Sequence, residues 1–158
     1  MKQSIINQLI SESDSILYGE NWLDATFEEK LHFIDSENAF TQPYQLKSVA
    51  ELLHHLLVWR EELLGRLSGE PTVRLKMSDE NNWLPLTKLQ AIGWESIRLE
   101  FFQSQDKFKA ILSEQADDFL LNFHEGSGYG YEQMCRSLIH HDIYHLGQIG
   151  ITIKFLRL

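Results

Sequence analysis

The run HHDIYHLGQI, residues 140–149, decides how this chain is interpreted. Its apolar residues recur at the spacing of a helix. His141 and His145 stand four residues apart, so both imidazoles project from one face of that helix and can reach a common point. The run therefore predicts a helix that offers two ligands to one metal ion.

The helix that contains this run is predicted to extend from about Tyr131 to Leu156 and to be buried on two sides. One stripe along it consists of Met134, Leu138, His141, His145, Gln148 and Thr152. A second, roughly opposite stripe consists of Ile139, Ile143, Leu146 and Gly150. A helix that is apolar on both sides is usually covered on both sides. We expect one side to face the other helices and the other to face a second subunit, with Gly147 and Gly150 allowing close approach, which predicts a homodimer.

Three further long helices are predicted upstream. They cover residues 5–17, residues 48–67 behind a capping box at Ser48, and residues 87–112. A short helix capped by Thr26 is predicted in the mixed stretch 21–47. No run has the alternation of a strand, so the fold class is predicted to be all-α, a four-helix bundle formed by one domain of residues 1–158.

Composition and charge exclude several classes of protein. The formal net charge of −9 argues against a nucleic-acid partner. No stretch is apolar enough for a membrane span or a signal peptide, and the single cysteine, Cys135, excludes an internal disulfide. These features favour a cytoplasmic protein. Cys135 lies off the histidine stripe, so we expect a structural thiol rather than a ligand.

A third metal ligand is predicted on the helix of residues 48–67. His55 lies between Leu52 and Trp59 on the inward face, while its neighbour His54 points about 100° away. Three imidazoles leave one coordination position open, as in catalytic metal sites. They suit zinc, nickel, copper or iron, and water in the open position would become more acidic.

Other residues are expected to support this metal site. Tyr144 and Gln148 lie one turn from His141 and His145 and are predicted to border the open position. Glu51, one turn before His55, is expected to orient the His55 ring. Asp142 is interpreted as a surface or capping charge.

Alternative interpretations of these motifs are open to test. An isolated pair of histidines at this spacing often arises on a solvated face. The doublet His141-Asp142 matches HD-type phosphohydrolases, but these need a later acidic ligand and no Asp or Glu follows Asp142. Glu51 and His54 match the Glu-x-x-His pattern of di-iron bundles, whose second copy occurs here only at residues 29–32, outside the long helices. The glycine-rich segment 126–130 lacks the strand and the lysine of a phosphate-binding loop, and we interpret it as a connector.

Two motifs resemble a known family. The run HDIYHLGQI, residues 141–149, closely resembles the C-terminal signature of the DinB-like superfamily, whose members are also described as YfiT-like metalloenzymes. The segment SVAELLHHLLVWRE, residues 48–61, resembles the family's second-helix motif. The similarity extends over essentially the whole chain in length and order of elements. It implies an up-down-down-up four-helix bundle, commonly a homodimer.

The resemblance also implies a set of ligands and a chemistry. The family's metal is held by one histidine of the second helix and two of the fourth, which correspond here to His55, His141 and His145. Characterised relatives include S-transferases and isomerases that use low-molecular-weight thiols. The resemblance thus implies a metal-dependent enzyme in which a cofactor thiolate attacks an electrophilic small molecule. A hydrolytic variant would use water at the metal, with Tyr144 or Gln148 positioning the substrate. Loops 21–47 and 70–86 would select that substrate.

The alternative function is not catalytic. The protein would then be a metal-stabilised dimer of the stress-response or binding type, in which the ion fastens the helices and the surface binds a partner.

Overall fold

The structure, a computed structural model, describes residues 4–70, 75–125 and 128–157. The long helices are α1 (Ile5–Leu17), α3 (Val49–Leu67), α5 (Trp94–Ser113) and α6 (Tyr131–Leu156). The shorter elements are α2 (Phe27–Leu31), α4 (Leu86–Ile92) and the 3-10 turns η1 (Pro43–Gln45), η2 (Glu80–Trp83) and η3 (Asp117–Leu121). In these ranges no strand forms beyond one bridge between Phe123 and Gly130. The predicted all-α class is confirmed.

Two helices begin at the capping boxes that the sequence predicts. At the start of α3, the backbone N–H of Glu51 donates to Ser48 Oγ at 3.2 Å, and Glu51 Oε2 accepts from the N–H of Ser48 at 2.9 Å. Thr26 and Glu29 make the same exchange at the start of α2. Such a cap stabilises a helix by about 1 kcal/mol. It also fixes where α3 begins, and thus which of its residues face inward.

The predicted helix over residues 87–112 is in fact two helices. The first begins one residue earlier than predicted, at Leu86, and ends at Ile92, before Gly93, whose φ of 91° and ψ of 145° are not helical. Glycine adopts this positive φ without the steric cost that a side chain would add. The chain turns there, and the buried Trp94 at the start of α5 donates from Nε1 to the carbonyl oxygen of Ile34 at 3.1 Å.

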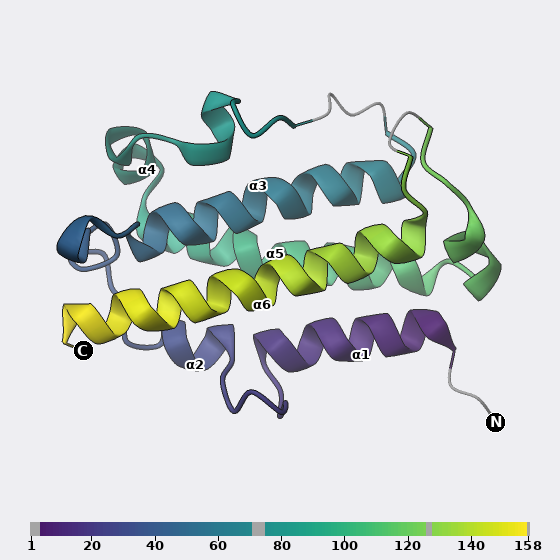
Figure 1. Ribbon diagram of the computed structural model, residues 1–158, viewed down its shortest axis with the longest axis horizontal. Coiled ribbons are helices and arrows are strands. Elements are labelled where there is room, and N and C mark those ends of the chain that lie inside the picture. Colours follow the sequence, from purple (N-terminus) through teal and green to yellow (C-terminus); the bar gives the residue numbers. More distant parts are fainter. Residues whose placement is uncertain (1–3, 71–74, 126–127, 158) are drawn as a thin grey trace.

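The four long helices pack side by side (Figure 1). Helix α3 contacts both α5 and α6, and α1 contacts the same two helices. In Figure 1, α1 and α6 run in one direction and α3 and α5 in the other. The segment with η2 and α4 lies over α3, and η2 contacts that helix directly. This arrangement places α3 and α6, the two helices with the predicted ligands, next to each other.

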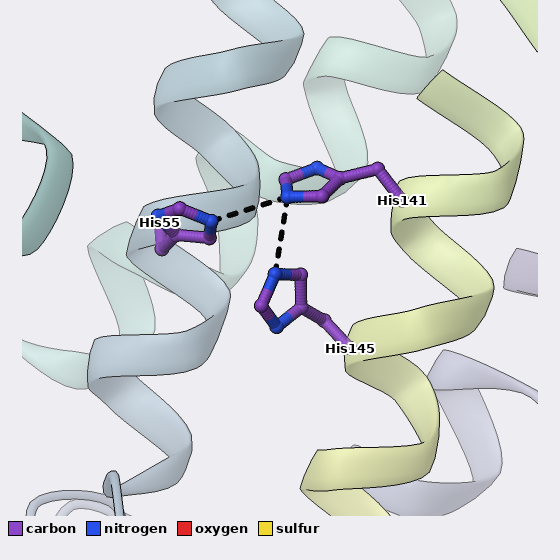
Figure 2. A group of neighbouring side chains, drawn as sticks. All are labelled: His55, His141 and His145. Carbon is purple, nitrogen blue, oxygen red and sulfur yellow. Dashed lines mark hydrogen bonds between the residues drawn. The ribbon is translucent and has the colours of Figure 1, made fainter. Parts of the chain in front are cut away.

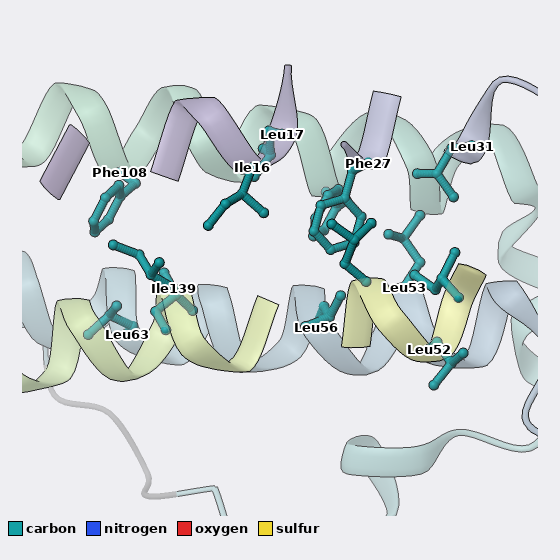
Figure 3. Packing of buried hydrophobic residues seen from close by; sticks show 14 of the residues in the cluster. Ile16, Leu17, Phe27, Leu31, Leu52, Leu53, Leu56, Leu63, Phe108 and Ile139 are labelled. Carbon is teal, nitrogen blue, oxygen red and sulfur yellow. The ribbon is translucent and has the colours of Figure 1, made fainter. Parts of the chain in front are cut away.

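The core between these helices is apolar. Figure 3 shows side chains from α1, α2, α3, α5 and α6 that meet in it. Its fully buried members include Leu17, Phe27, Leu53, Leu56, Phe101 and Phe108. Burial of one such side chain stabilises the fold by about 1.5–3 kcal/mol relative to leaving it in water. The core therefore holds α3 and α6 in place around the histidines.

Asp142 is not the surface or capping charge that we expected. Its side chain is 1% exposed and forms an ion pair with Arg60 of α3, which is equally buried. Arg60 donates from Nη2 to Asp142 Oδ2 at 2.5 Å and from Nε to Oδ1 at 3.3 Å. On a helix, Asp142 lies about 100° from His141 and so points into the core rather than toward the histidine stripe.

The second stripe of α6 packs within its own chain. Ile139 and Leu146 are buried in the core, and Ile143 packs against it. The side of α6 that is left to solvent carries Tyr144, Ile151 and Phe155, which are about half exposed or more. A Cβ added at Gly147 would meet nothing, so this glycine allows no close approach within the chain. The homodimer stays a prediction, with that outer side as its candidate contact.

Cys135 is a free, buried cysteine on α6. Burial raises the pKa of its thiol to about 12. A thiol that stays protonated is a poor nucleophile and a poor ligand, which agrees with the structural role expected for it. In the part of the chain that the structure describes, no helix is long and apolar enough to span a membrane.

Candidate metal centre

Three histidines converge between α3 and α6 (Figure 2). His55 projects from α3, and His141 and His145 project from successive turns of α6. The distance between the Nε2 atoms of His55 and His141 is 3.1 Å, and that between the Nε2 atoms of His145 and His141 is 3.0 Å. One ligand atom from each ring lies within 4.8 Å of the others. The structure thus brings together the three histidines that the sequence predicts as ligands.

Hydrogen bonds on the far side of two rings fix their tautomers. His55 Nδ1 lies 3.0 Å from the backbone carbonyl oxygen of Asn82, which can only accept, so Nδ1 carries the proton. His145 Nδ1 lies 2.6 Å from Gln148 Oε1, and the same reasoning applies. Both rings therefore direct an Nε2 lone pair toward His141.

This arrangement fits a metal ion better than it fits three free imidazoles. Without a metal, the Nε2 atoms of His55 and His145 could both accept only from one proton, that on His141 Nε2. Zinc with Zn–N distances of about 2.0–2.1 Å holds tetrahedral ligand atoms roughly 3.3 Å apart, close to the 3.1 Å and 3.0 Å that separate His141 Nε2 from the other two rings. A nitrogen-only donor set is compatible with zinc, nickel, copper or iron.

Burial keeps the three rings neutral. It is the main cause that lowers the pKa of His141 to about 3, and the neighbouring His145 and His55 act in the same direction. Burial likewise lowers the pKa of His145 to about 4, although the bond to Gln148 acts in the other direction. The pKa of His55 is lowered by the same cause. Neutral imidazole is the form that binds metals, so no proton has to be removed at neutral pH.

Aromatic side chains wall the site. Trp83 of η2 stacks on His55 with ring centroids 4.0 Å apart and an angle of 7° between the planes. Trp59 of α3 and His141 form a T-shaped contact, with ring centroids 6.0 Å apart. The indole N–H of Trp59 donates to Asn82 Oδ1 at 2.9 Å. These contacts restrict how the rings can turn.

Asn82, a residue of η2, was not predicted from the sequence. Its side chain is fully buried and donates from Nδ2 to the carbonyl oxygen of Met77 at 3.1 Å. Its backbone carbonyl orients His55, a task that we had assigned to Glu51. A backbone acceptor in a turn leaves no pattern in the sequence, so no signal could have identified it.

Glu51 does not touch His55. Its carboxylate accepts from Gln42 Nε2 at 2.7 Å, from Lys47 Nζ at 2.7 Å and from Ser48 Oγ at 2.9 Å. Burial alone would raise the pKa of Glu51, but the hydrogen bonds from Lys47 and Ser48 outweigh it and lower the pKa. The carboxylate is therefore occupied at the start of α3.

Gln148 and Tyr144 lie beside the histidines, and their place at an open metal position stays a prediction. Gln148 Nε2 donates to Tyr144 Oη at 3.1 Å, while its Oε1 holds His145. Tyr144 is 64% exposed. Both residues line a cavity of about 730 Å³ that is also bordered by the three histidines. His54, which we did not count as a ligand, is not part of the histidine group.

Comparison with known families agrees with the geometry. The model of the DinB superfamily matches residues 20–149, a stretch that contains all three histidines. Neither the curated proteins nor the solved structures gave a match to this chain.

Proposed function

Because the chain belongs to the DinB superfamily, we propose that it is a metal-dependent enzyme whose ion is held by His55, His141 and His145. One observation carries this proposal: two rings are held by outside acceptors in the tautomer that turns their lone pairs toward the third. A site built only for packing would not need that orientation. Outer hydrogen bonds of this kind are typical of ligand histidines in metal sites.

We propose one of two reactions on a small-molecule substrate. Either the thiolate of a low-molecular-weight cofactor attacks an electrophilic substrate, or water hydrolyses the substrate. A bound divalent ion would supply Lewis acidity, which lowers the pKa of a thiol or water in the open position. The chain's own residues do the rest. Gln148 keeps His145 oriented, and Tyr144 and Gln148 offer polar groups to a substrate at the edge of the cavity. Trp83 covers one face of the His55 ring, and Trp59 packs against His141.

An open cavity beside the histidines favours an enzyme over a purely structural ion. In a structural site the fourth position is closed by a further protein ligand. Among the described residues, the group that could hold an ion comprises the three histidines and no fourth ligand. The non-catalytic, metal-stabilised dimer is the alternative against which this proposal is tested.

The proposal includes three properties of the whole protein. The helix directions in Figure 1 support an up-down-down-up four-helix bundle. The outer side of α6, with Ile151 and Phe155 exposed, supports a homodimer. The free thiol of Cys135 supports a cytoplasmic location, where thiols stay reduced.

Metal titration of two neighbouring variants tests the proposed ion. His55→Ala removes a ligand, whereas His54→Ala removes a histidine of the same helix that lies outside the group. Zinc binding is measured by competition with a chromophoric chelator. We expect one zinc per chain for wild type and His54→Ala, and a large loss of affinity for His55→Ala. Equal affinities for the two variants would refute the assigned ligands.

Turnover is tested on the zinc-loaded protein. Thiol cofactors are combined with model electrophiles and ester substrates, and product is followed against metal-free protein. Zinc-dependent turnover that His55→Ala abolishes supports the enzyme. Tight zinc binding that raises the melting temperature without turnover supports the structural alternative.

A further inference from the structure

The cavity beside the histidines is elongated. It is bordered by α3, by α6 and by residues near η2, and it reaches from His55 to Arg66 along α3. Eleven residues of helix span roughly 16 Å. Its volume of about 730 Å³ lies in the range of pockets that enclose drug-sized molecules. A single thiol or water at the histidines would leave most of this space empty.

The part of the cavity beyond the histidines has apolar walls. The apolar lining residues there are Trp59, Leu63, Met77, Met134 and Leu138, and Tyr129 and Ser137 also line the cavity. Leu63, Met134 and Leu138 come from the facing helices α3 and α6, and each is less than 10% exposed. Covering such a surface with an apolar ligand lowers the free energy of the complex, because apolar area is removed from water.

The charged side chains that line the cavity are already paired. Lys47 bonds to Glu51 at 2.7 Å, and its ammonium lies over the Trp83 ring at 4.8 Å from the centroid. At the far end, Arg66 is paired with Glu62, whose carboxylate also accepts from the N–H of Leu75 at 3.0 Å. Each of these charges is matched by an opposite charge within the protein, although Arg66 Nε and Glu62 Oε2 are buried without a hydrogen-bond partner. A charged group on a ligand would therefore lose its hydration in the apolar part and meet no net charge that offsets this loss.

We propose that the cavity takes a molecule with an uncharged, apolar body, which lies between Trp59 and Arg66 along α3 and brings its reactive group to the histidines. This inference rests on the proposed function and narrows it, because it selects apolar electrophiles or esters over charged metabolites as substrates. It also separates binding of the body from binding of the metal, so the two can be measured independently.

A matched pair of fluorescent probes tests the proposal. N-phenyl-1-naphthylamine is uncharged, and 1-anilinonaphthalene-8-sulfonate has the same ring system with one added sulfonate. Both become brighter in apolar surroundings, and both are titrated into metal-free protein in the presence of EDTA. We expect the uncharged probe to bind at least about tenfold more tightly, since the sulfonate must be desolvated beside charges that are already paired within the protein. Equal affinities, or tighter binding of the sulfonate, would overturn the proposal.

Two variants locate the bound probe. Met77 lines the cavity and is 72% exposed, and Leu121 of η3 lies outside the cavity and is 73% exposed. Neither change should prevent folding, because both side chains face solvent. We expect Met77→Glu to weaken binding of the uncharged probe by on the order of fivefold, by placing a charge beside the apolar wall, and Leu121→Glu to leave it unchanged. An effect of Leu121→Glu as large as that of Met77→Glu would place the probe elsewhere and contradict the inference.

Zinc titration of the same samples separates this proposal from the metal site. Tight binding of the uncharged probe without any zinc binding would refute the proposed function and leave the apolar cavity intact. Zinc binding without preference for the uncharged probe would refute the apolar substrate and leave the metal site intact.

Discussion

Two polar clusters lie between α3 and α6. The side chains of one satisfy each other's hydrogen bonds, whereas the nitrogens of the other share too few protons to do so. In the first, Arg60 and Asp142 are 1% exposed and satisfy each other through two hydrogen bonds. In the second, His55, His141 and His145 direct nitrogens toward one point and border a cavity. His141 and Asp142 are adjacent in sequence but belong to different clusters, because one step along a helix turns the side chain by about 100°.

The first cluster continues into the rest of the fold. Arg60 Nη1 donates to Gln105 Oε1 of α5 at 3.1 Å, and the same oxygen accepts from Ser13 Oγ of α1 at 2.9 Å. Gln105 Nε2 donates to Asp14 at 2.8 Å. All four long helices are thus linked by one buried network. A satisfied network of this kind makes the packing specific. The histidine nitrogens share too few protons to satisfy one another, so they remain available to bind a metal ion.

Removing Asp142 should have the largest effect on stability. Asp142→Ala leaves the Arg60 guanidinium buried without its counter-charge, which we expect to lower the free energy of unfolding by about 3–5 kcal/mol. Urea denaturation of metal-free protein measures this. The control is Glu95→Ala, which breaks the exposed pair with Arg98 and should cost about 0–1 kcal/mol.

The double variant Arg60→Met with Asp142→Leu sharpens this test. Replacing a buried ion pair by apolar residues of similar size is often neutral or stabilising. Much of the stability lost in Asp142→Ala should therefore return. If Asp142→Ala costs no more than Glu95→Ala, the network does not support the fold and the contrast between the clusters fails.

Removing His145 should act on metal rather than on the fold. His145→Ala takes away one of three proposed ligands, and we expect zinc affinity to fall by more than about 100-fold, beyond the usual effect of outer-sphere residues. The free energy of unfolding without metal should change by only about 1 kcal/mol, a typical value for a point substitution. If His145→Ala loses as much stability as Asp142→Ala and still binds zinc, then His145 supports the fold and is not a metal ligand.

Gln148 is expected to act through His145. Gln148→Leu removes the acceptor that fixes the His145 tautomer, so zinc affinity should fall by about tenfold. Tyr144→Phe is the matched control, because the Tyr144 hydroxyl contacts Gln148 and not the histidines directly. Zinc affinity should be nearly unchanged in it. Wild-type affinity in Gln148→Leu would show that this amide does not orient the ring.

The sequence was sufficient for features that repeat along a single helix. The capping box at Ser48 and the three- and four-residue spacing identified α3 and its inward face, and with it His55. The same spacing placed His141 and His145 on one stripe of α6. Periodicity also concealed something. It suggested a continuous helix through Gly93, although a glycine in that position signals an interruption.

The sequence was not sufficient for contacts between distant segments. Arg60 is 82 residues from Asp142, and nothing near either residue indicates their ion pair. Asn82 and Trp83 complete the histidine site from a turn without periodicity. The sequence predicts two contacts for Glu51, the cap of α3 and a hydrogen bond to His55. Its carboxylate makes the first, and the carbonyl of Asn82 bonds to His55 instead. One acceptor group with strong local donors is seldom free for another partner.

Acidification should have the smallest effect, and it tests the histidine cluster alone. In the unfolded chain a histidine takes up a proton below its ordinary pKa of about 6.5. In the folded, metal-free protein, burial lowers the pKa of His141 to about 3 and that of His145 to about 4. The unfolded state therefore binds more protons between pH 6.5 and pH 4, so the free energy of unfolding should fall as the pH falls through this window. The slope should be shallow, since His141 is only half-buried and solvent screens part of the shift.

The double variant His141→Gln with His145→Gln isolates this contribution. The difference in urea midpoint between wild type and variant is compared at pH 7 and pH 5, above the range in which most carboxylates titrate. We expect wild type to lose relatively more stability at pH 5. A difference that is the same at both pH values would mean that water reaches both rings in the folded protein. The histidine cluster would then be an ordinary solvated surface. Its difference from the buried Arg60–Asp142 pair would be one of exposure, and burial would not be what keeps the imidazoles neutral for metal binding.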